Sequence, residues 1–310
     1  MPSFTFNQVA ALWKADKRRY VKKTSYAAYV QHLNKHIIPY FGDRSIFTAD
    51  DIQQYADHLL AGGLSLNTAR DCIVILKMVY RFGERIGAWP HLDFRVHYPT
   101  AMEEQKELPV LAMPQQQRLA RYLRENFSFR NLGILICLQS GLRIGEICAL
   151  QWKDIDIVSG EIHVRKTVNR VWLSDGDDRE YSVSVGMPKT SSSVRNIPVT
   201  KELAAVIKPL RKFMNPEYYI VSNDATPLEP RYYRYYFIKV LEKLDIPPIR
   251  FHALRHSFAT RCIESKCDYK TVSVILGHAS IATTLDMYVH PGYADKKRCI
   301  EKMAKSLAVR

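Results

Sequence analysis

The sequence has 310 residues, of which 47% are hydrophobic and 25% are charged. These proportions exclude wholesale disorder, and the length allows one large domain or two ordinary ones. Lysine and arginine total 45 against 31 aspartate and glutamate residues, which gives a net charge of +14. A polyanion, and nucleic acid first, is therefore the expected partner, with a basic protein that lacks such a partner as the alternative.

The lack of a recognisable targeting signal and the pattern of the cysteines both favour a protein of the cell interior. The opening MPSFTFNQVAALWKADKRRY has no sustained apolar stretch, and no window approaches the ~18 apolar residues of a membrane span. Six scattered cysteines fit reduced thiols better than a disulfide framework. We therefore expect a cytoplasmic, DNA-associated protein with no membrane partner.

The first hundred residues are expected to form a small helical domain. Thr24 or Ser25 is the expected N-cap of TSYAAYVQHLNKHIIPYFG, and Thr48 is the expected N-cap of ADDIQQYADHLLAGG. A further helix is expected to stop at Gly87. Together these segments predict a four-helix unit with basic loops. The domain limits expected are 1–100 for this unit, 101–109 for a proline-marked linker, and 110–310 for a second domain.

The second domain is expected to be helical with one small antiparallel sheet. Pro114 suits the first turn of a helix, and Gly141 ends the buried helix NLGILICLQS. Residues 155–199 change to β-rich runs, with the charged LSDGDDRE as a hairpin tip, and helices resume at Thr200. The predicted fold class is mainly α with a small antiparallel β-sheet.

The stretch FHALRHSFATR places His252, Arg255 and His256 within five positions. A zinc site would need a third ligand, and a hydrolytic one would need a glutamate where Ala253 stands. Polar residues satisfied inside a core are a second alternative. His252 and Arg255, three apart on one helix face, favour an anion site, so we expect neither a metal nor a cofactor.

Each of the other residues that could take part in chemistry is weak evidence for a functional site by itself. Arg143 follows Gly141 in SGLRIGE, where it can project into a cleft with Glu146 placed to orient it, although a surface arginine is equally common. Lys189 near a strand end is uninformative alone. His278 follows the helix stop Gly277, and Tyr288 ends a short helix capped by Ser280. A single tyrosine at a helix end is usually structural.

The ordered set of SGLR, Lys189, HALRH, LGH and LDMYVH resembles the catalytic signature of the tyrosine recombinase (phage integrase) family, over nearly the whole chain. The helical N-terminal part is similar to that family's core-binding domain, and residues from about 108 are similar to its catalytic domain. The resemblance implies a site-specific DNA recombinase that cleaves and rejoins DNA through a covalent 3′-phosphotyrosyl link, without metal or ATP. A type IB topoisomerase-like relaxing enzyme and a non-catalytic DNA-binding regulator are the alternatives.

The resemblance also implies a role for each residue. Arg143 and Arg255 would neutralise the nonbridging phosphate oxygens, and His252 and His278 would add hydrogen bonds. Tyr288 would be the nucleophile, with His252 as the nearest group to take its proton and Lys189 as general acid. Glu146 and His256 would hold these residues in position without contacting the phosphate themselves.

Double-stranded DNA and a second copy of the chain are the expected partners. Expected DNA contacts are Lys17, Arg18, Arg19, Lys22, Lys23, Asn67, Thr68, Arg70, Arg231 and Arg234. Ile300, Met303 and Leu307 form an apolar stripe that covers the chain's own core or, as in the family, docks into a neighbour within a tetramer on paired DNA sites. The early start of the core-binding helices favours a simple recombinase or mobile-element integrase, with accessory DNA-bending or excisionase proteins as further partners.

Overall fold

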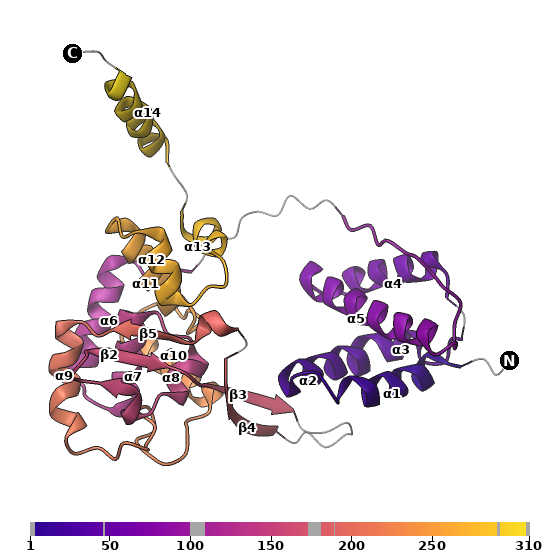
Figure 1. The fold of residues 1–310 in the computed structure, drawn as a ribbon, viewed down its shortest axis with the longest axis horizontal. Helices are drawn as coiled ribbons and strands as arrows, with labels where there is room; N and C mark the ends of the chain where they lie inside the picture. The colour runs from indigo at the N-terminus through magenta and orange to yellow at the C-terminus, as the bar shows by residue number, and fades with distance from the viewer. Residues whose placement is uncertain are drawn as a thin grey trace. The chain divides into compact units, whose positions relative to one another are not determined.

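The computed structural model describes residues 4–45, 47–99, 109–172, 181–188, 190–289 and 292–307. The chain divides into two compact units, 1–105 with 170–182 and 106–169 with 183–310. The described part is mostly helical with small β-sheets, which confirms the predicted fold class (Figure 1). Within it, no helix combines the length and the hydrophobicity that crossing a membrane requires.

The first unit is built from helices around an aromatic core. Its elements are α1 (Phe6–Lys17), α2 (Lys23–His32), the π-helix η1 (Leu33–Ile37), α3 (Ile38–Phe41), α4 (Ala49–Ala61) and α5 (Leu66–Arg85). Phe6 stacks on Trp89 with ring centroids 6.0 Å apart, and the Phe47 ring meets Trp89 edge-on. Buried aromatic rings from the helices and from the segment after α5 therefore hold this unit together.

Two of the three expected helix signals in this unit are confirmed. Thr48 accepts a hydrogen bond from the backbone N–H of Asp51, whose carboxylate accepts one from the Thr48 backbone N–H. The helix α5 ends just before Gly87. The expected cap at Thr24 or Ser25 is wrong, because both already lie inside α2 and the extended Lys22 precedes its first residue, Lys23.

The second unit is helical around a short sheet. Its elements are α6 (Met113–Glu125), α7 (Phe129–Ser140), α8 (Ile144–Ala149), the 3-10 helix η2 (Trp152–Asp154), β1 (Ile155–Asp156), β2 (Glu161–Val164), β3 (Thr167–Trp172), β4 (Tyr181–Gly186), the 3-10 helix η3 (Ser191–Ser193), β5 (Arg195–Pro198), α9 (Lys201–Arg211), α10 (Pro230–Lys243), α11 (Ala253–Glu264), α12 (Tyr269–Leu276), α13 (Ile281–Tyr288) and α14 (Tyr293–Leu307). The outer part of β3 and β4 groups with the first unit.

In the described part of the chain the strands form two sheets, so the expectation of one sheet is corrected. Strands β1, β2 and β5 pair antiparallel in that order, with Ile162 opposite both Ile155 and Ile197. Strands β3 and β4 pair only with each other. The isoleucines of the three-stranded sheet belong to the same buried core as α7, a helix buried along nearly its whole length, whereas the β3–β4 ladder is half-exposed. The expected hairpin tip LSDGDDRE lies outside the described residues.

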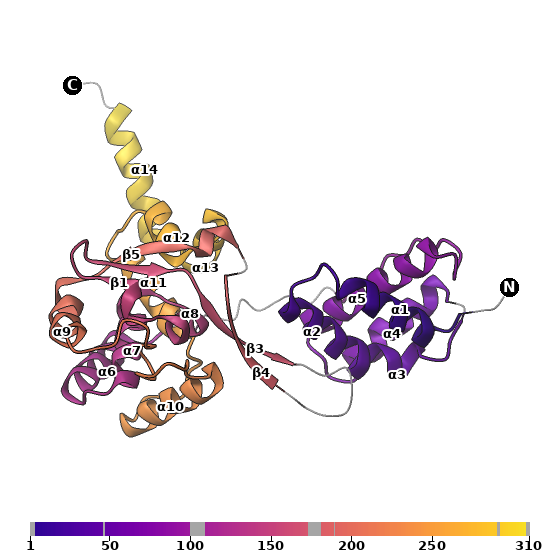
Figure 2. The same ribbon diagram turned by 60° about the horizontal axis from the view of Figure 1, so that its bottom comes forward.

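Helices α11, α12 and α13 pack against one another at one end of the second unit, and α12 also contacts β5 (Figure 2). Asp268 caps α12, and Ser280 caps α13 as predicted. The apolar stripe of α14 is exposed, with Ile300, Met303 and Leu307 at 63%, 52% and 72%. The alternative that this stripe covers the chain's own core is therefore wrong.

Candidate active site

Two left-handed glycines bring the candidate residues together. Gly141 ends α7 at φ 66° and Gly277 ends α12 at φ 67°, a conformation that glycine adopts without strain. A Cβ on Gly141 would lie only 2.7 Å from the Phe258 ring of α11 and 2.8 Å from the Leu276 side chain of α12. Only glycine therefore allows the turn before Arg143 to pack so closely on α11 and α12.

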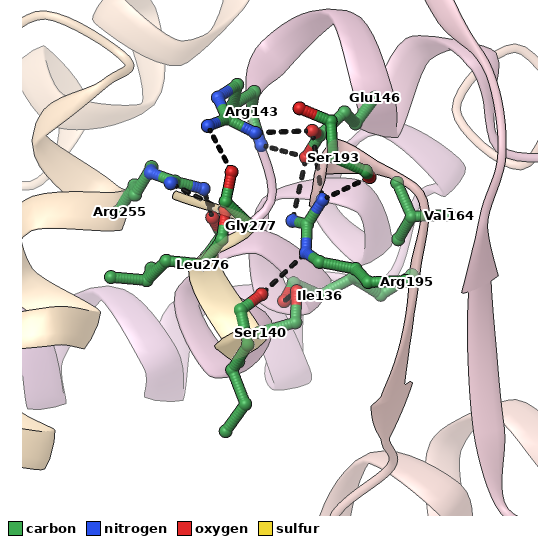
Figure 3. A network of polar contacts seen from close by, with 12 residues as sticks. Ile136, Ser140, Arg143, Glu146, Val164, Ser193, Arg195, Arg255, Leu276 and Gly277 are labelled. Atoms are coloured by element: carbon green, nitrogen blue, oxygen red, sulfur yellow. Dashed lines mark hydrogen bonds and ion pairs between the residues drawn. The ribbon is translucent and has the colours of Figure 1, made fainter. Parts of the chain in front are cut away.

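Arg143 and Arg255 converge on the C-terminal end of α12. Arg255, 1% exposed, donates to the carbonyls of Leu276 at 2.7 Å and Gly141 at 2.9 Å. Arg143 donates to the Gly277 carbonyl at 3.2 Å and keeps about a third of its side chain exposed (Figure 3). Carbonyls at a helix end lack intrahelical donors and carry partial negative charge, so they attract the two guanidinium groups.

Glu146 is buried between two arginines. Its carboxylate accepts hydrogen bonds from the Arg143 guanidinium at 2.8 Å and from the Arg143 backbone N–H at 2.9 Å. Arg195 approaches from β5 with a bidentate pair at 2.9 and 3.0 Å. Burial alone would raise the pKa of Glu146, but hydrogen bonds and charge from Arg195 and Arg143 lower it. Glu146 thus contacts Arg143, one of the residues that it was expected to orient.

Arg195 is a site residue that sequence reasoning missed. It occupies the first position of β5, where inward and outward side chains alternate and Ile197 is the next inward residue. A charged residue at an inward position of a half-buried strand is the signal that could have revealed it, because such a residue needs a buried partner. No spacing rule links it to Glu146, which lies 49 residues away.

Tyr288 lies beside a different histidine from the one expected. Its hydroxyl is 2.7 Å from Nδ1 of His256, and both residues are buried. The expected proton acceptor, His252, instead directly precedes the first residue of α11, with its ring edge-on to His256 at 4.7 Å between centroids. The histidine that contacts Tyr288 therefore lies one helical turn after the histidine that was expected to do so.

The ionisation states around Tyr288 follow from burial. Burial raises the pKa of Tyr288, opposed by the positive charges of Arg255 and Arg143. Burial lowers the pKa of His256, and it lowers that of His252 and of His278 to about 4, in each case helped by neighbouring positive charge. At neutral pH the phenol is therefore protonated and the three imidazoles are neutral.

His278 is fixed just beyond α12. Its Nδ1 lies 2.8 Å from the hydroxyl of the buried Thr284 on α13. That contact fixes the ring next to the Gly277 carbonyl that Arg143 caps. In the described part of the chain, no group of three or more His, Cys, Asp or Glu side chains is arranged to hold a metal ion.

Two family models match this chain. The model described as "Phage integrase family" matches residues 110–295, and the model "Phage integrase, N-terminal SAM-like domain" matches residues 5–60. The chain belongs to the phage integrase family. It is a site-specific tyrosine recombinase, a DNA strand-transferring enzyme.

Relatives of this recombinase include proteins named as tyrosine recombinases and as integrases. It is 26% identical to a "Tyrosine recombinase XerC-like" protein of Caldanaerobacter subterraneus, over 84% of this chain and 71% of that one. It is 28% identical to the ICEBs1 integrase of Bacillus subtilis, over 87% of this chain and 75% of that one.

Solved structures share the recombinase's fold. The Tn1549 transposon integrase, solved with transposon right-end DNA, matches with a TM-score of 0.76 at 21% identity, covering 97% of this chain and 100% of that one. Lambda integrase, solved as a tetramer on a Holliday junction, matches with a TM-score of 0.66 at 16% identity, over 94% and 80% of the two chains.

Lys189 lies outside the described residues. The segment that follows it belongs to the recombinase's site, because the Ser192 carbonyl is 2.9 Å from the position of a Cβ on Gly277. Strand β5 begins at Arg195, directly after that segment. Ser192 and Arg195 thus pack against the turn that carries His278.

The expected DNA contacts fall on both units of the recombinase. Arg18, Arg19, Lys22 and Lys23 are exposed at the end of α1 and the start of α2, and Lys17 is half-buried over the Tyr20 ring at 4.9 Å. Asn67, Thr68 and Arg70 lie in the first turns of α5, where Arg70 covers the Tyr98 ring at 5.4 Å. Arg231 and Arg234 are exposed on α10 in the second unit. None of these residues belongs to the site around Tyr288.

Proposed function

We propose that this recombinase cleaves one DNA strand by attack of the Tyr288 hydroxyl on a backbone phosphorus, forming a 3′-phosphotyrosyl bond and releasing a 5′-hydroxyl. A second 5′-hydroxyl then attacks that bond and restores both the phosphodiester and the tyrosine. The observation that carries the proposal is the hydrogen-bonded His256–Tyr288 pair next to Arg143 and Arg255. Because one phosphoester replaces another, neither ATP nor a metal is needed.

The charge of the site suits this step. Attack adds negative charge to the nonbridging oxygens, and the guanidinium groups of Arg143 and Arg255 can fork onto them. Burial and the Arg143 charge lower the pKa of Arg255 to about 9, which leaves it charged at neutral pH. The arginines would exchange backbone carbonyls of α12 for phosphate oxygens when DNA binds.

Proton transfers are assigned to two groups, His256 and Lys189. Neutral His256 takes the proton of the Tyr288 hydroxyl, which its Nδ1 already contacts. Lys189 gives a proton to the leaving 5′-oxygen. His252 and His278 donate hydrogen bonds to the phosphate without adding full charges.

The organisation proposed around this site follows the family. Residues 1–100 form the core-binding domain, 101–109 a linker and 110–310 the catalytic domain. The basic residues of α1, α2, α5 and α10 bind double-stranded DNA in the cytoplasm. The exposed stripe of α14 favours a recombinase that assembles as a tetramer on paired sites over a monomeric DNA-relaxing enzyme. Mobile-element integration, with accessory DNA-bending or excisionase proteins, is the proposed setting.

A nicked duplex tests the chemistry. Its sequence is taken from DNA that the protein enriches from its own genome, and the nick lets the cleaved fragment diffuse away. The wild-type chain should form a covalent protein–DNA adduct, and Tyr288→Phe should abolish the adduct while DNA affinity stays unchanged. An adduct that survives Tyr288→Phe would falsify the nucleophile assignment.

A further inference from the structure

Arg195 is a buried cation that the proposed chemistry does not use. Its side chain is 4% exposed, and its guanidinium makes a bidentate pair with Glu146 at 2.9 and 3.0 Å (Figure 3). It also donates to the carbonyls of Ser193 at 3.0 Å and Ile275 at 2.5 Å. One side chain of β5 thus joins α8, η3 and α12.

The bond to Ile275 completes a pattern at the end of α12. Three consecutive backbone carbonyls each accept from a different arginine: Ile275 from Arg195, Leu276 from Arg255, and Gly277 from Arg143. Arg143 and Arg255 are the groups assigned to the phosphate, and they would leave their carbonyls when DNA binds. Arg195 is held by Glu146 as well, so it can stay and keep the helix end in place.

Glu146 in turn depends on the positive charge of Arg195. A buried carboxylate with too little positive charge nearby is strongly unfavourable. With Arg195 in its bidentate position, Glu146 can orient Arg143. The Arg143 guanidinium then still has N–H groups that can donate to the phosphate. Without Arg195, the carboxylate would hold Arg143 as its main counter-charge or take up a proton.

We propose that Arg195 is a positioning residue for strand cleavage: it fixes Glu146 and the C-terminal end of α12, and through them it places Arg143 and His278 at the scissile phosphate. The proposal rests on the proposed function, because it assumes that Arg143 and His278 contact that phosphate. Arg195 itself contacts backbone carbonyls and Glu146, and not the reacting atoms.

The test compares Arg195→Met and Arg195→Lys with Arg165→Met. Arg165 is an exposed arginine that donates to the Arg195 carbonyl and to Asn196, and its bonds do not include Glu146. Single-turnover cleavage of the nicked duplex is measured with protein in excess. Arg195→Met should cleave on the order of 100-fold more slowly, as misplacement by about 1 Å can do, with DNA affinity within about twofold of wild type. Arg195→Lys should recover part of the rate, and Arg165→Met should match wild type.

The pH profile separates positioning from a merely structural role. Arg143, Arg195 and Arg255 surround Glu146, with His252 and Cys137 also within electrostatic reach. Loss of Arg195 should raise the pKa of Glu146, and Glu146 orients Arg143 as a carboxylate. The cleavage rate of Arg195→Met should therefore rise with pH more steeply than the wild-type rate, as Glu146 loses its proton. Adding Glu146→Gln should remove that extra dependence on pH.

Two outcomes would overturn the proposal. One is a cleavage rate for Arg195→Met equal to that of Arg165→Met, and the other is a slowed rate whose pH profile parallels wild type. If Arg195→Met fails to fold by circular dichroism, Arg195→Lys is judged by the same rate and pH criteria. Failure of the proposed function has a different signature: the wild-type chain forms no adduct, or Tyr288→Phe still forms one.

Discussion

The Tyr288 hydroxyl lies 2.7 Å from Nδ1 of His256, while His252, one turn earlier on α11, meets only the edge of the His256 ring. Residues four apart share one face of a helix, which brings the two histidine rings together, and the later one contacts the phenol. A neutral imidazole at hydrogen-bond distance from a protonated phenol is placed to accept its proton.

Replacing His256 with Phe should slow covalent adduct formation by about 100-fold or more, the usual contribution of a proton acceptor. Phe keeps a ring in the buried space but has no nitrogen to take the phenol proton. The defect should shrink as pH rises, because solvent base then takes over. Single-turnover cleavage from pH 6.5 to 9.5 measures this, with His252→Phe as the matched comparison. A full rate for His256→Phe beside a pH-dependent defect in His252→Phe would restore the original assignment.

Lys189→Ala should slow cleavage because the departing 5′-oxygen no longer receives a proton. A substrate with sulfur in place of that bridging oxygen leaves as a thiolate, which needs no proton since a thiol pKa of ~8.5 lies far below that of an alcohol. Lys189→Ala should therefore cleave the sulfur substrate at the wild-type rate. Equal defects on both substrates would remove Lys189 from the general-acid role and leave it a phosphate contact.

The second unit should lose stability as pH falls from about 6.5 toward 4. His252 and His278 have pKa values of about 4 when folded, against 6.5 for an unperturbed histidine. Between those values the unfolded chain binds more protons, so the free energy of unfolding falls as pH is lowered. Urea unfolding at pH 7 and pH 4.5 measures the change, and His278→Gln should weaken the pH dependence. A stability that rises toward pH 4.5 contradicts the assignment.

Neutralising Lys22 and Lys23 together should weaken DNA binding at every sequence and flatten its dependence on salt. Each phosphate contact contributes about 0.9 to the slope of log affinity against log salt, so losing two contacts should reduce the slope by about 2. Fluorescence anisotropy between 50 and 250 mM salt gives the slope, and Lys201→Gln, at the exposed start of α9, is the control. An unchanged slope would place these lysines off the DNA.

Replacing Ile300, Met303 and Leu307 with Ser should prevent assembly without stopping chemistry. The three side chains are exposed at helical spacing, so a second copy is the partner expected to bury them. Light scattering of the DNA complex should show loss of the tetramer, while adduct formation on a single nicked site persists. Lys302→Ser, on the same helix but off the stripe, serves as the control, and a tetramer that survives the triple change would exclude this docking mode.

Local signals were predicted well where one short segment decides the outcome. The stops at Gly141 and Gly277 and the caps at Thr48 and Ser280 depend on a few neighbouring residues, and the structure has them all. The cap expected at Thr24 or Ser25 failed because the chain enters the helix two residues early, at Lys23. Positions of helix ends in a basic, cap-poor stretch depend on packing more than on one side chain.

The sequence by itself determined the family, the helical character and the residue types that gather for phosphate chemistry, because these rest on short ordered motifs and local backbone preferences. The tertiary structure alone decided which histidine meets Tyr288 and brought Arg195 to Glu146. Both contacts join segments tens of residues apart, 32 in one case and 49 in the other, and no periodicity along the chain encodes the distance across a packed core.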